Sequence, residues 1–192
     1  MTRVALFGGS FNPPHVAHEL VALYVLETQP VDELWFLPVY QHVFDDKKHL
    51  ASFEDRVAMC QLLADALGSR AKVSRSEEAL AHEPGFHGSR TFDLLELLAR
   101  TDPDVEPRWV VGSDILGETD KWYRWPDVAL RAPLIVIERP GYPVPAGYSQ
   151  RALAMPDVSS TRIRDALKEG RELPDLLPRS VMEYIERRQL YR

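Results

Sequence analysis

The chain has 192 residues, of which 45% are hydrophobic and 27% are charged, and its formal net charge is −6. This composition is typical of a globular protein with one α/β domain, and the sequence contains no run of 18 apolar residues that would span a membrane. With neither a signal-like leader nor a long basic stretch, we expect a cytoplasmic protein that binds no membrane and no nucleic acid, although one focused basic pocket would accept a small phosphorylated ligand.

Short apolar runs alternate with helical patterns along the chain. Strands are predicted at 3–7, 33–38, 70–74, 107–112 and within 132–142, where Pro140 and Gly141 end the last one. Helices are predicted at 15–28, 52–67, 89–100, 158–171 and 178–191, whereas 39–52 is predicted as a loop and 75–88 as irregular. The alternation predicts an α/β fold, a doubly wound parallel sheet with helices on both faces. We expect one domain over 1–192, with the sheet and its helices in 1–156 and a small helical portion in 157–192.

Four segments with candidate functional residues follow the predicted strands. They comprise residues 8–18, 38–48 and 112–114, together with Arg139. In parallel sheets of this type, ligands bind at the carboxyl ends of the strands, where the connections lead off in opposite directions. We therefore expect these segments to converge on one edge of the sheet.

The segment GGSFNPPHVAH, residues 8–18, joins the first strand to the first helix. Gly8 and Gly9 permit a tight turn and a close approach of backbone N–H groups to a ligand. The helix behind them has a positive N-terminal end, and His15 and His18 lie three residues apart on its first turn. Two imidazole donors directed at one place suit phosphate oxygens, above all those of a phosphoryl group in a transition state. The alternative is a glycine turn followed by two histidines with purely structural roles.

Other phosphate-binding and metal-binding patterns are missing from the sequence. It has neither G-x-x-x-x-G-K-[ST] nor G-x-G-x-x-G after the first strand, which argues against an ATPase-type phosphate loop and dehydrogenase-type dinucleotide binding. No carboxylate or cysteine has a spacing that would complete a metal site with the histidines, so we predict no metal held by the protein. Cys60 is the single cysteine, and its helical pattern predicts a buried core position rather than a nucleophile.

A second candidate segment is SSTRIR, residues 159–164. Its Ser and Thr residues can cap the following helix, which places hydroxyl and N–H groups near the positive helix end. Arg164 lies one turn further on and can reach back to a phosphate with a forked pair of donors, whereas Arg162 is expected to face solvent. The segment alone is equally compatible with a plain capped helix.

These two segments resemble the signature segments of the nicotinate (or nicotinamide) mononucleotide adenylyltransferases. That family belongs to the nucleotidyltransferases that carry a histidine pair on a Rossmann-like fold. GSD at 112–114, KWY at 121–123 and ERPGY at 138–142 also match in order, so the resemblance spans nearly the whole chain. The resemblance implies transfer of AMP from ATP to nicotinate mononucleotide, or also to its amide, with a dinucleotide and pyrophosphate as products. We expect Mg²⁺ to be bound through the ATP phosphates.

The resemblance also implies roles for individual residues. The ATP site would comprise the backbone of Gly8, Gly9, Ser10 and Phe11, the phosphate-binding His15 and His18, Gly112 and Asp114 on the adenosine side, and Ser160, Thr161 and Arg164 at the triphosphate. The mononucleotide would be surrounded by Thr91, Trp122, Tyr123 and Arg139. A tryptophan face attracts a flat pyridinium ring, although hydrophobic packing is the common role of tryptophan. Asp114 can equally act as a helix cap.

The sequence departs from this family in two places. Bacterial relatives often have a PPHK-like stretch after the second strand, whereas here the loop reads LPVYQHVFDDKKHL, in which His42, Lys47 and Lys48 are candidates for the β- and γ-phosphates. Many relatives have Ser-Tyr-Thr where this chain has Ser89, Arg90 and Thr91, which leaves the choice between the acid and the amide open.

Two other functions remain open at the level of the sequence. The first is adenylyl or cytidylyl transfer to another acceptor, such as phosphopantetheine or glycerol phosphate, which would not need Trp122 and Arg139. The second is a module that binds ATP without turning it over. The sequence gives no oligomeric state.

Overall fold

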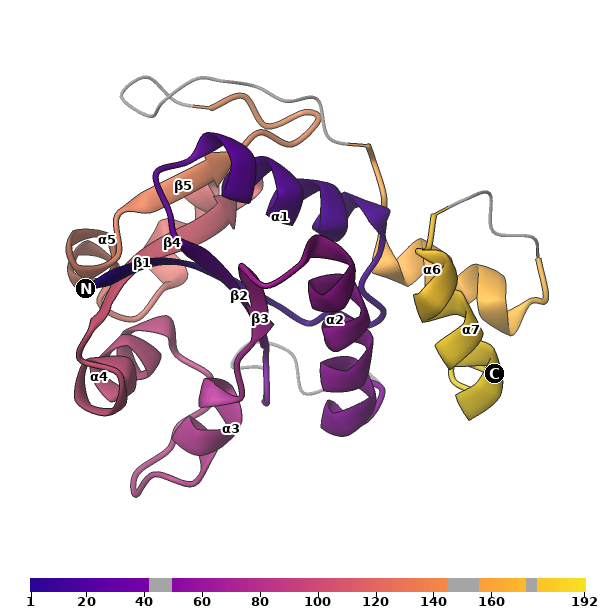
Figure 1. The fold of residues 1–192 in the computed structure, drawn as a ribbon, viewed down its shortest axis with the longest axis horizontal. Coiled ribbons are helices and arrows are strands. Elements are labelled where there is room, and N and C mark those ends of the chain that lie inside the picture. Colours follow the sequence, from indigo (N-terminus) through magenta and orange to yellow (C-terminus); the bar gives the residue numbers. More distant parts are fainter. Residues whose placement is uncertain (42–49, 145–155, 172–175) are drawn as a thin grey trace.

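A computed structural model describes residues 1–41, 50–144, 156–171 and 176–192. Within these ranges a parallel sheet has the strand order β3-β2-β1-β4-β5 (Figure 1). Its strands are β1 (Thr2–Gly9), β2 (Glu33–Pro38), β3 (Ala71–Val73), β4 (Val105–Gly112) and β5 (Leu134–Ile137). The chain runs outward from β1 to β3, then crosses to β4 on the other side of β1. The predicted doubly wound, Rossmann-like sheet is confirmed, with its switch point between β1 and β4.

Helices cover both faces of the sheet (Figure 1). They are α1 (Val16–Thr28), α2 (Phe53–Leu67), α3 (Ser76–Ala81), α4 (Thr91–Thr101), the 3₁₀ helix η1 (Ser113–Lys121), α5 (Trp125–Arg131), α6 (Ser160–Lys168) and α7 (Arg179–Arg188). Side chains alternate along β1, so that Ala5 belongs to the core shared with residues of α1, α2 and α7, whereas Val4 and Leu6 belong to the core shared with residues of α3, α4 and α5. Cys60 is buried in the first of these cores, as its pattern predicted.

The prediction of irregular structure at 75–88 was wrong in part, because α3 occupies its first half. The helices η1 and α5, between β4 and β5, were not predicted. Both α3 and α5 span two turns or fewer, so neither shows the repeated apolar spacing from which a helix is identified. η1 adds a 3₁₀ geometry that the 3.6-residue period does not detect.

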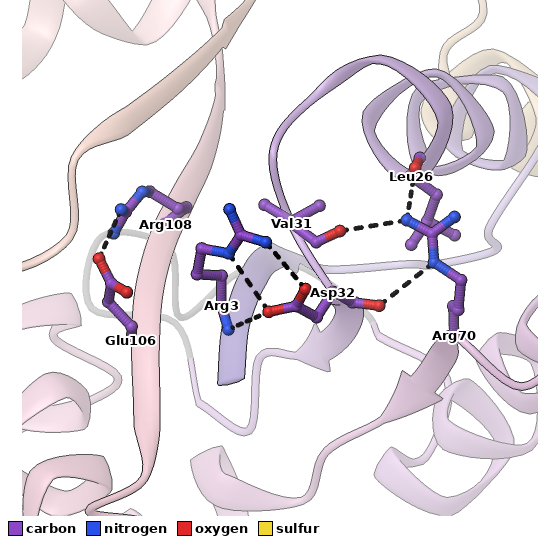
Figure 2. A network of polar contacts seen from close by, with 7 residues as sticks. All are labelled: Arg3, Leu26, Val31, Asp32, Arg70, Glu106 and Arg108. Atoms are coloured by element: carbon purple, nitrogen blue, oxygen red, sulfur yellow. Dashed lines mark hydrogen bonds and ion pairs between the residues drawn. The ribbon is translucent and has the colours of Figure 1, made fainter. Parts of the chain in front are cut away.

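A polar network joins the amino ends of the strands (Figure 2). The Asp32 carboxylate accepts hydrogen bonds from the backbone N–H and the guanidinium of Arg3, at 2.8 to 3.3 Å. Arg70 donates to the carbonyl oxygens of Leu26, Val31 and Asp32, at 2.6, 3.1 and 3.2 Å. These contacts tie together the amino ends of β1, β2 and β3.

Among the residues that the structure describes, no helix has both the length and the apolar character needed to cross a lipid bilayer.

Candidate active site

The loop between β1 and α1 is fixed in position by Arg56, a fully buried residue of α2. Its guanidinium donates to three backbone carbonyl oxygens, those of Ser10 at 3.0 Å, Val39 at 2.8 Å and Ala51 at 3.1 Å. A buried charge needs several such partners to offset the loss of solvation. Burial lowers the pKa of Arg56 from its ordinary value, yet an arginine remains charged at neutral pH. One side chain therefore fixes the carboxyl ends of β1 and β2 relative to each other.

The C-terminal helices attach to the same loop through Asn12 and Pro13. Ser160 Oγ donates to the Pro13 carbonyl oxygen at 3.0 Å, and Arg164 Nη1 donates to that of Asn12 at 2.8 Å. The buried Asn12 side chain accepts at Oδ1 from the Tyr191 hydroxyl at 2.9 Å. The SSTRIR segment and Tyr191 thus hydrogen-bond residues of the loop 10–15, called the histidine loop below.

His15 and His18 occupy the start of α1, with His15 as the N-cap residue. Their imidazole rings stack with centroids 3.7 Å apart and planes inclined by 26°. The backbone N–H of His15 donates to Nδ1 of His18 at 3.1 Å. Phe11, with a φ of 45°, packs its ring edge-on to His18 with centroids 5.0 Å apart. The predicted pair therefore exists as one rigid unit on the first helical turn.

Both histidines are kept neutral in the absence of a ligand. Burial, and then the positive charge of Arg139, lower the pKa of His15 from 6.5 to about 4. Burial also lowers the pKa of His18 well below 6.5, with further contributions from the charges of His15 and Arg139. Neutral imidazoles donate hydrogen bonds without carrying a charge that must be desolvated, and an arriving phosphate would draw protons toward them.

A cavity of about 170 Å³ lies beside the histidines, at the carboxyl ends of β4 and β5. Gly112, Asp114 and Arg139 line it together with His15 and His18. Asp114 Oδ1 lies 3.4 Å from Arg139 Nε, and the buried Ser113 hydroxyl accepts from the Arg139 backbone N–H at 2.9 Å. This cavity thus offers a carboxylate and a guanidinium a short distance from two imidazoles.

Position 112 has no room for a side chain while this ion pair keeps its geometry, because the chain passes against it. A Cβ there would lie 2.2 Å from Asp114 Oδ1 and 2.8 Å from Arg139 Nε. Asp114 follows in the first turn of η1, whose N-cap is Gly112, so Asp114 is not the cap itself.

A second, larger cavity of about 740 Å³ opens on the other side of β4. Its residues from the predicted set are Gly8, Gly9, Ser10, Thr91, Trp122 and Tyr123. Trp122 is half-buried and meets Trp125 edge-on, with centroids 5.3 Å apart. Val111 lines both cavities, so the end of β4 separates them.

The structure places the predicted site residues in these two cavities, in the loop between β1 and α1, and on α6. Gly8, Gly9 and Ser10, predicted at the ATP site, line the second cavity with Trp122. Arg139, predicted near the mononucleotide with Trp122, lines the histidine cavity instead. Ser160, Thr161 and Arg164 line neither cavity, and Thr161 accepts from Arg164 Nη2 at 3.1 Å. His42, Lys47 and Lys48 lie outside the described residues.

Three residues that sequence reasoning missed support the site. They are Arg56, Tyr191 and Glu77, of which Glu77 is buried and lines the second cavity. Arg56 had a detectable signal, because it lies three, four and seven residues before the buried Met59, Cys60 and Leu63, on the apolar face of its helix. Tyr191 and Glu77 had none.

Among the described residues, no group of three histidine, cysteine or acidic side chains is arranged to hold a metal ion. Asp114, a carboxylate that lines the histidine cavity, already has the Arg139 guanidinium as its neighbour. This donor set fits a metal ion that arrives with a nucleotide and keeps water and phosphate ligands, as Mg²⁺ prefers.

Comparisons with known proteins identify the family of the chain. The family model of cytidylyltransferase-like proteins matches residues 6–166. A probable nicotinate-nucleotide adenylyltransferase of Anaeromyxobacter dehalogenans is 46% identical over 190 residues, which cover 99% of this chain and 97% of that protein. A relative of the same description from Myxococcus xanthus is 41% identical over 189 residues, with 98% and 94% covered.

A likeness to a solved structure concerns the fold alone. Nicotinic acid mononucleotide adenylyltransferase of Plasmodium falciparum, solved in complex with NaAD, superposes with a TM-score of 0.78 at 20% identity, over 100% of this chain and 98% of that one. On the strength of the family model and the full-length relatives, the chain belongs to the cytidylyltransferase-like family and, within it, to the nicotinate-nucleotide adenylyltransferases.

Proposed function

We propose that this enzyme transfers AMP from MgATP to nicotinate mononucleotide, in the cytoplasm, as one domain of 192 residues. A phosphate oxygen of the mononucleotide attacks the α-phosphorus of ATP, the bond from that phosphorus to the bridging oxygen breaks, and pyrophosphate leaves with the electron pair. No nucleophile from the protein is needed. Catalysis then consists of alignment of the two substrates and stabilisation of the charge that builds up on the phosphoryl oxygens.

The stacked imidazoles of His15 and His18 are the observation that carries this proposal. Because the His15 N–H fixes Nδ1 of His18 as an acceptor, the remaining donor of His18 is Nε2–H. His15 and His18 line the same cavity, so we assign both to the phosphates around the transferred group. Their neutral state in the free enzyme allows a rise in pKa when the phosphates bind, which strengthens both hydrogen bonds.

The two cavities supply one compartment for each substrate. We assign the adenosine side of ATP to the first, where Gly112, Asp114 and Arg139 meet the histidines. We assign the mononucleotide to the second, where Trp122 provides an aromatic face for a pyridinium ring and Thr91 begins α4. The switch point between β1 and β4 lies between them, so the reacting phosphates would meet at the histidine loop.

The C-terminal segment takes a different part from the one that its sequence first indicates. Ser160 donates a hydrogen bond to the carbonyl oxygen of Pro13, and Arg164 donates one to that of Asn12. These carbonyl groups lie two and three residues before His15. We assign to them the positioning of the histidine loop, and to the remaining donors of Arg164 a contact with the triphosphate. His42 and Lys47 remain our candidates for the β- and γ-phosphates. Mg²⁺ enters with ATP, where it neutralises the leaving pyrophosphate.

The test is release of pyrophosphate and formation of dinucleotide by the purified chain, supplied with MgATP and nicotinate mononucleotide. We expect turnover with this acceptor and none with phosphopantetheine, or with glycerol phosphate and CTP. Turnover only with one of those acceptors would contradict the assigned substrate. ATP binding without pyrophosphate release, whichever acceptor is supplied, would contradict an enzymatic role.

A further inference from the structure

Three cationic side chains line the second cavity, and two of them are already neutralised. Lys121 Nζ pairs with Glu118 at 2.9 Å, and Arg124 Nε pairs with Asp127 at 2.8 Å. The third is Arg90, whose side chain makes no hydrogen bond or ion pair with any residue in the described ranges. Within this wall, Arg90 is therefore the cation whose charge is left for a ligand.

The Arg90 guanidinium is held in place by an aromatic ring. Its central carbon lies 4.7 Å from the centroid of Tyr123, which also lines the cavity and is 49% exposed. Stacking on a ring face leaves the in-plane N–H donors of the guanidinium free. Trp122 and Thr91 are the chain neighbours of Tyr123 and Arg90, and both line the same cavity. The Arg90 guanidinium is thus held against Tyr123 with its donors unused. Tyr123 is the chain neighbour of Trp122, whose face is assigned to the pyridine ring.

This geometry points to Arg90 as the residue that binds the pyridine carboxylate of the mononucleotide and so selects the acid over the amide; the inference rests on the function proposed above. A carboxylate accepts two parallel hydrogen bonds from a guanidinium and cancels its charge. A carboxamide offers one acceptor oxygen, and its NH₂ group would face the donors of Arg90. Two acidic residues, Glu77 and Asp120, also line the cavity, and an unpaired cation offsets their repulsion of an anionic substrate.

The other anion of the same substrate is its 5′-phosphate, which the acid and the amide share. A residue that binds this phosphate would affect the two substrates equally. Comparison of the two mononucleotides therefore separates the two sources of negative charge.

The experiment measures kcat/KM for nicotinate and nicotinamide mononucleotides in the wild type, Arg90→Gln and Arg90→Lys, and Kd for both by calorimetry. We expect Arg90→Gln to lower kcat/KM for the acid by about 10- to 100-fold, the usual range for loss of a hydrogen bond to a charged group, and for the amide by less than about threefold. For the acid, kcat/KM of Arg90→Lys should lie between those of the wild type and Arg90→Gln, since lysine keeps the charge without the forked pair of donors. The acid-to-amide ratio of Kd should move in the same direction.

The matched control is Arg124→Gln. It removes another cation from the same wall, one whose charge Asp127 already neutralises. It should leave the acid-to-amide ratio unchanged. An equal loss for both substrates in Arg90→Gln, no loss for either, or the same shift of the ratio in Arg124→Gln would overturn the assignment. A wild type that turns over neither mononucleotide would contradict the proposed function instead, and the Kd ratios would still decide the role of Arg90.

Discussion

The backbone N–H of His15 donates to Nδ1 of His18 over 3.1 Å, while the two rings stack 3.7 Å apart. An N–H group can only donate, so Nδ1 of His18 must be free of a proton and its single N–H is at Nε2. A second proton at Nδ1 would face this donor, which adds to the burial that lowers the pKa of His18. His18 therefore has two separable tasks under the proposed function: Nδ1 accepts a hydrogen bond at the helix start, and Nε2–H is left as the donor for the phosphates.

Replacement of His18 by Asn or by Ala should separate these tasks. Asn places its Oδ1 where Nδ1 accepts the His15 N–H, so we expect Asn to keep the free energy of unfolding within about 0.5 kcal/mol, whereas Ala should lose about 1 kcal/mol with the cap. Both variants lack a donor at the position of Nε2, which the proposed function assigns to the phosphates, and should lose about 10²- to 10³-fold in kcat. Urea unfolding and pyrophosphate release measure the two effects.

His82→Asn is the control, since this exposed histidine bonds the Glu78 carbonyl oxygen and lines neither cavity. It should leave both quantities unchanged. Turnover of His18→Asn within about threefold of the wild type would show that Nε2–H does not serve the phosphates.

The lowered pKa of His15 makes the stability of the free enzyme fall with acidification. The folded state holds His15 neutral down to about pH 4, whereas in the unfolded chain it takes up a proton near pH 6.5. Below pH 6.5 the unfolded state therefore binds more protons, and stability is lost as the pH falls from 6.5 toward 4. At pH 5 the expected loss from this residue is about 2 kcal/mol.

His15→Asn removes the titrating group and retains a residue type that caps helices well. We expect the difference in unfolding free energy between wild type and variant to move by about 2 kcal/mol in favour of the variant between pH 7.5 and pH 5. Urea unfolding at both pH values measures it. A difference that stays constant with pH would mean that His15 titrates normally in the folded protein.

The fold was predictable from the sequence because hydrophobic periodicity is a local signal. The runs that became β1, β2, β4 and β5 are apolar and bounded by glycine, proline or charged residues, and the longer helices repeat their apolar positions over several turns. The histidine pair was equally local, because a spacing of three on a helical turn determines which side chains share a face.

The supporting contacts were not predictable, because they join residues far apart in the sequence. The bond from Arg56 to the Ser10 carbonyl spans 46 positions, and that from Tyr191 to Asn12 spans 179. The placement of Arg139 beside the histidines, rather than beside Trp122, depends on non-local pairing in the same way. The sequence shows that it follows a strand, but only the pairing of β5 with the outer edge of β4 brings it to the histidine cavity.

Gly112→Ala should disable the ATP side of the site without unfolding the protein. The added Cβ would lie 2.2 Å from Asp114 Oδ1, so the carboxylate and its Arg139 partner must move. We expect KM for ATP to rise by about tenfold or more, since a displaced charged contact costs at least 1.4 kcal/mol. KM for the mononucleotide should change little, because Gly112 does not line the second cavity.

Gly117→Ala is the matched control for this substitution. Gly117 lies in the same 3₁₀ helix, and a Cβ there would have no atom within 4 Å. Steady-state kinetics with each substrate varied in turn should give wild-type KM values for Gly117→Ala. An unchanged KM for ATP in Gly112→Ala would contradict the assignment of the first cavity to ATP.

Glu77 is a buried carboxyl group that destabilises the free enzyme at alkaline pH. Its Oε2 has no hydrogen-bond partner among the described residues, although the carboxylate also accepts from the Ser89 side chain and the Tyr40 backbone and feels the charge of Arg56. Burial outweighs these contacts and raises its pKa from 4.5 to about 7. Between these values the folded state binds the extra proton, so stability falls as the pH rises from 4.5 through 7.

Glu77→Gln keeps the shape of the side chain and removes the charge, so it should stabilise the protein at pH 8 by about 2 kcal/mol more than at pH 5. Thermal or urea unfolding at the two pH values measures this gain. Glu78→Gln is the neighbouring control: Arg75 lowers the pKa of Glu78, so this change should bring no gain at pH 8. An equal effect of Glu77→Gln at both pH values would show that Glu77 is ionised in both, because its proton would then not be linked to folding.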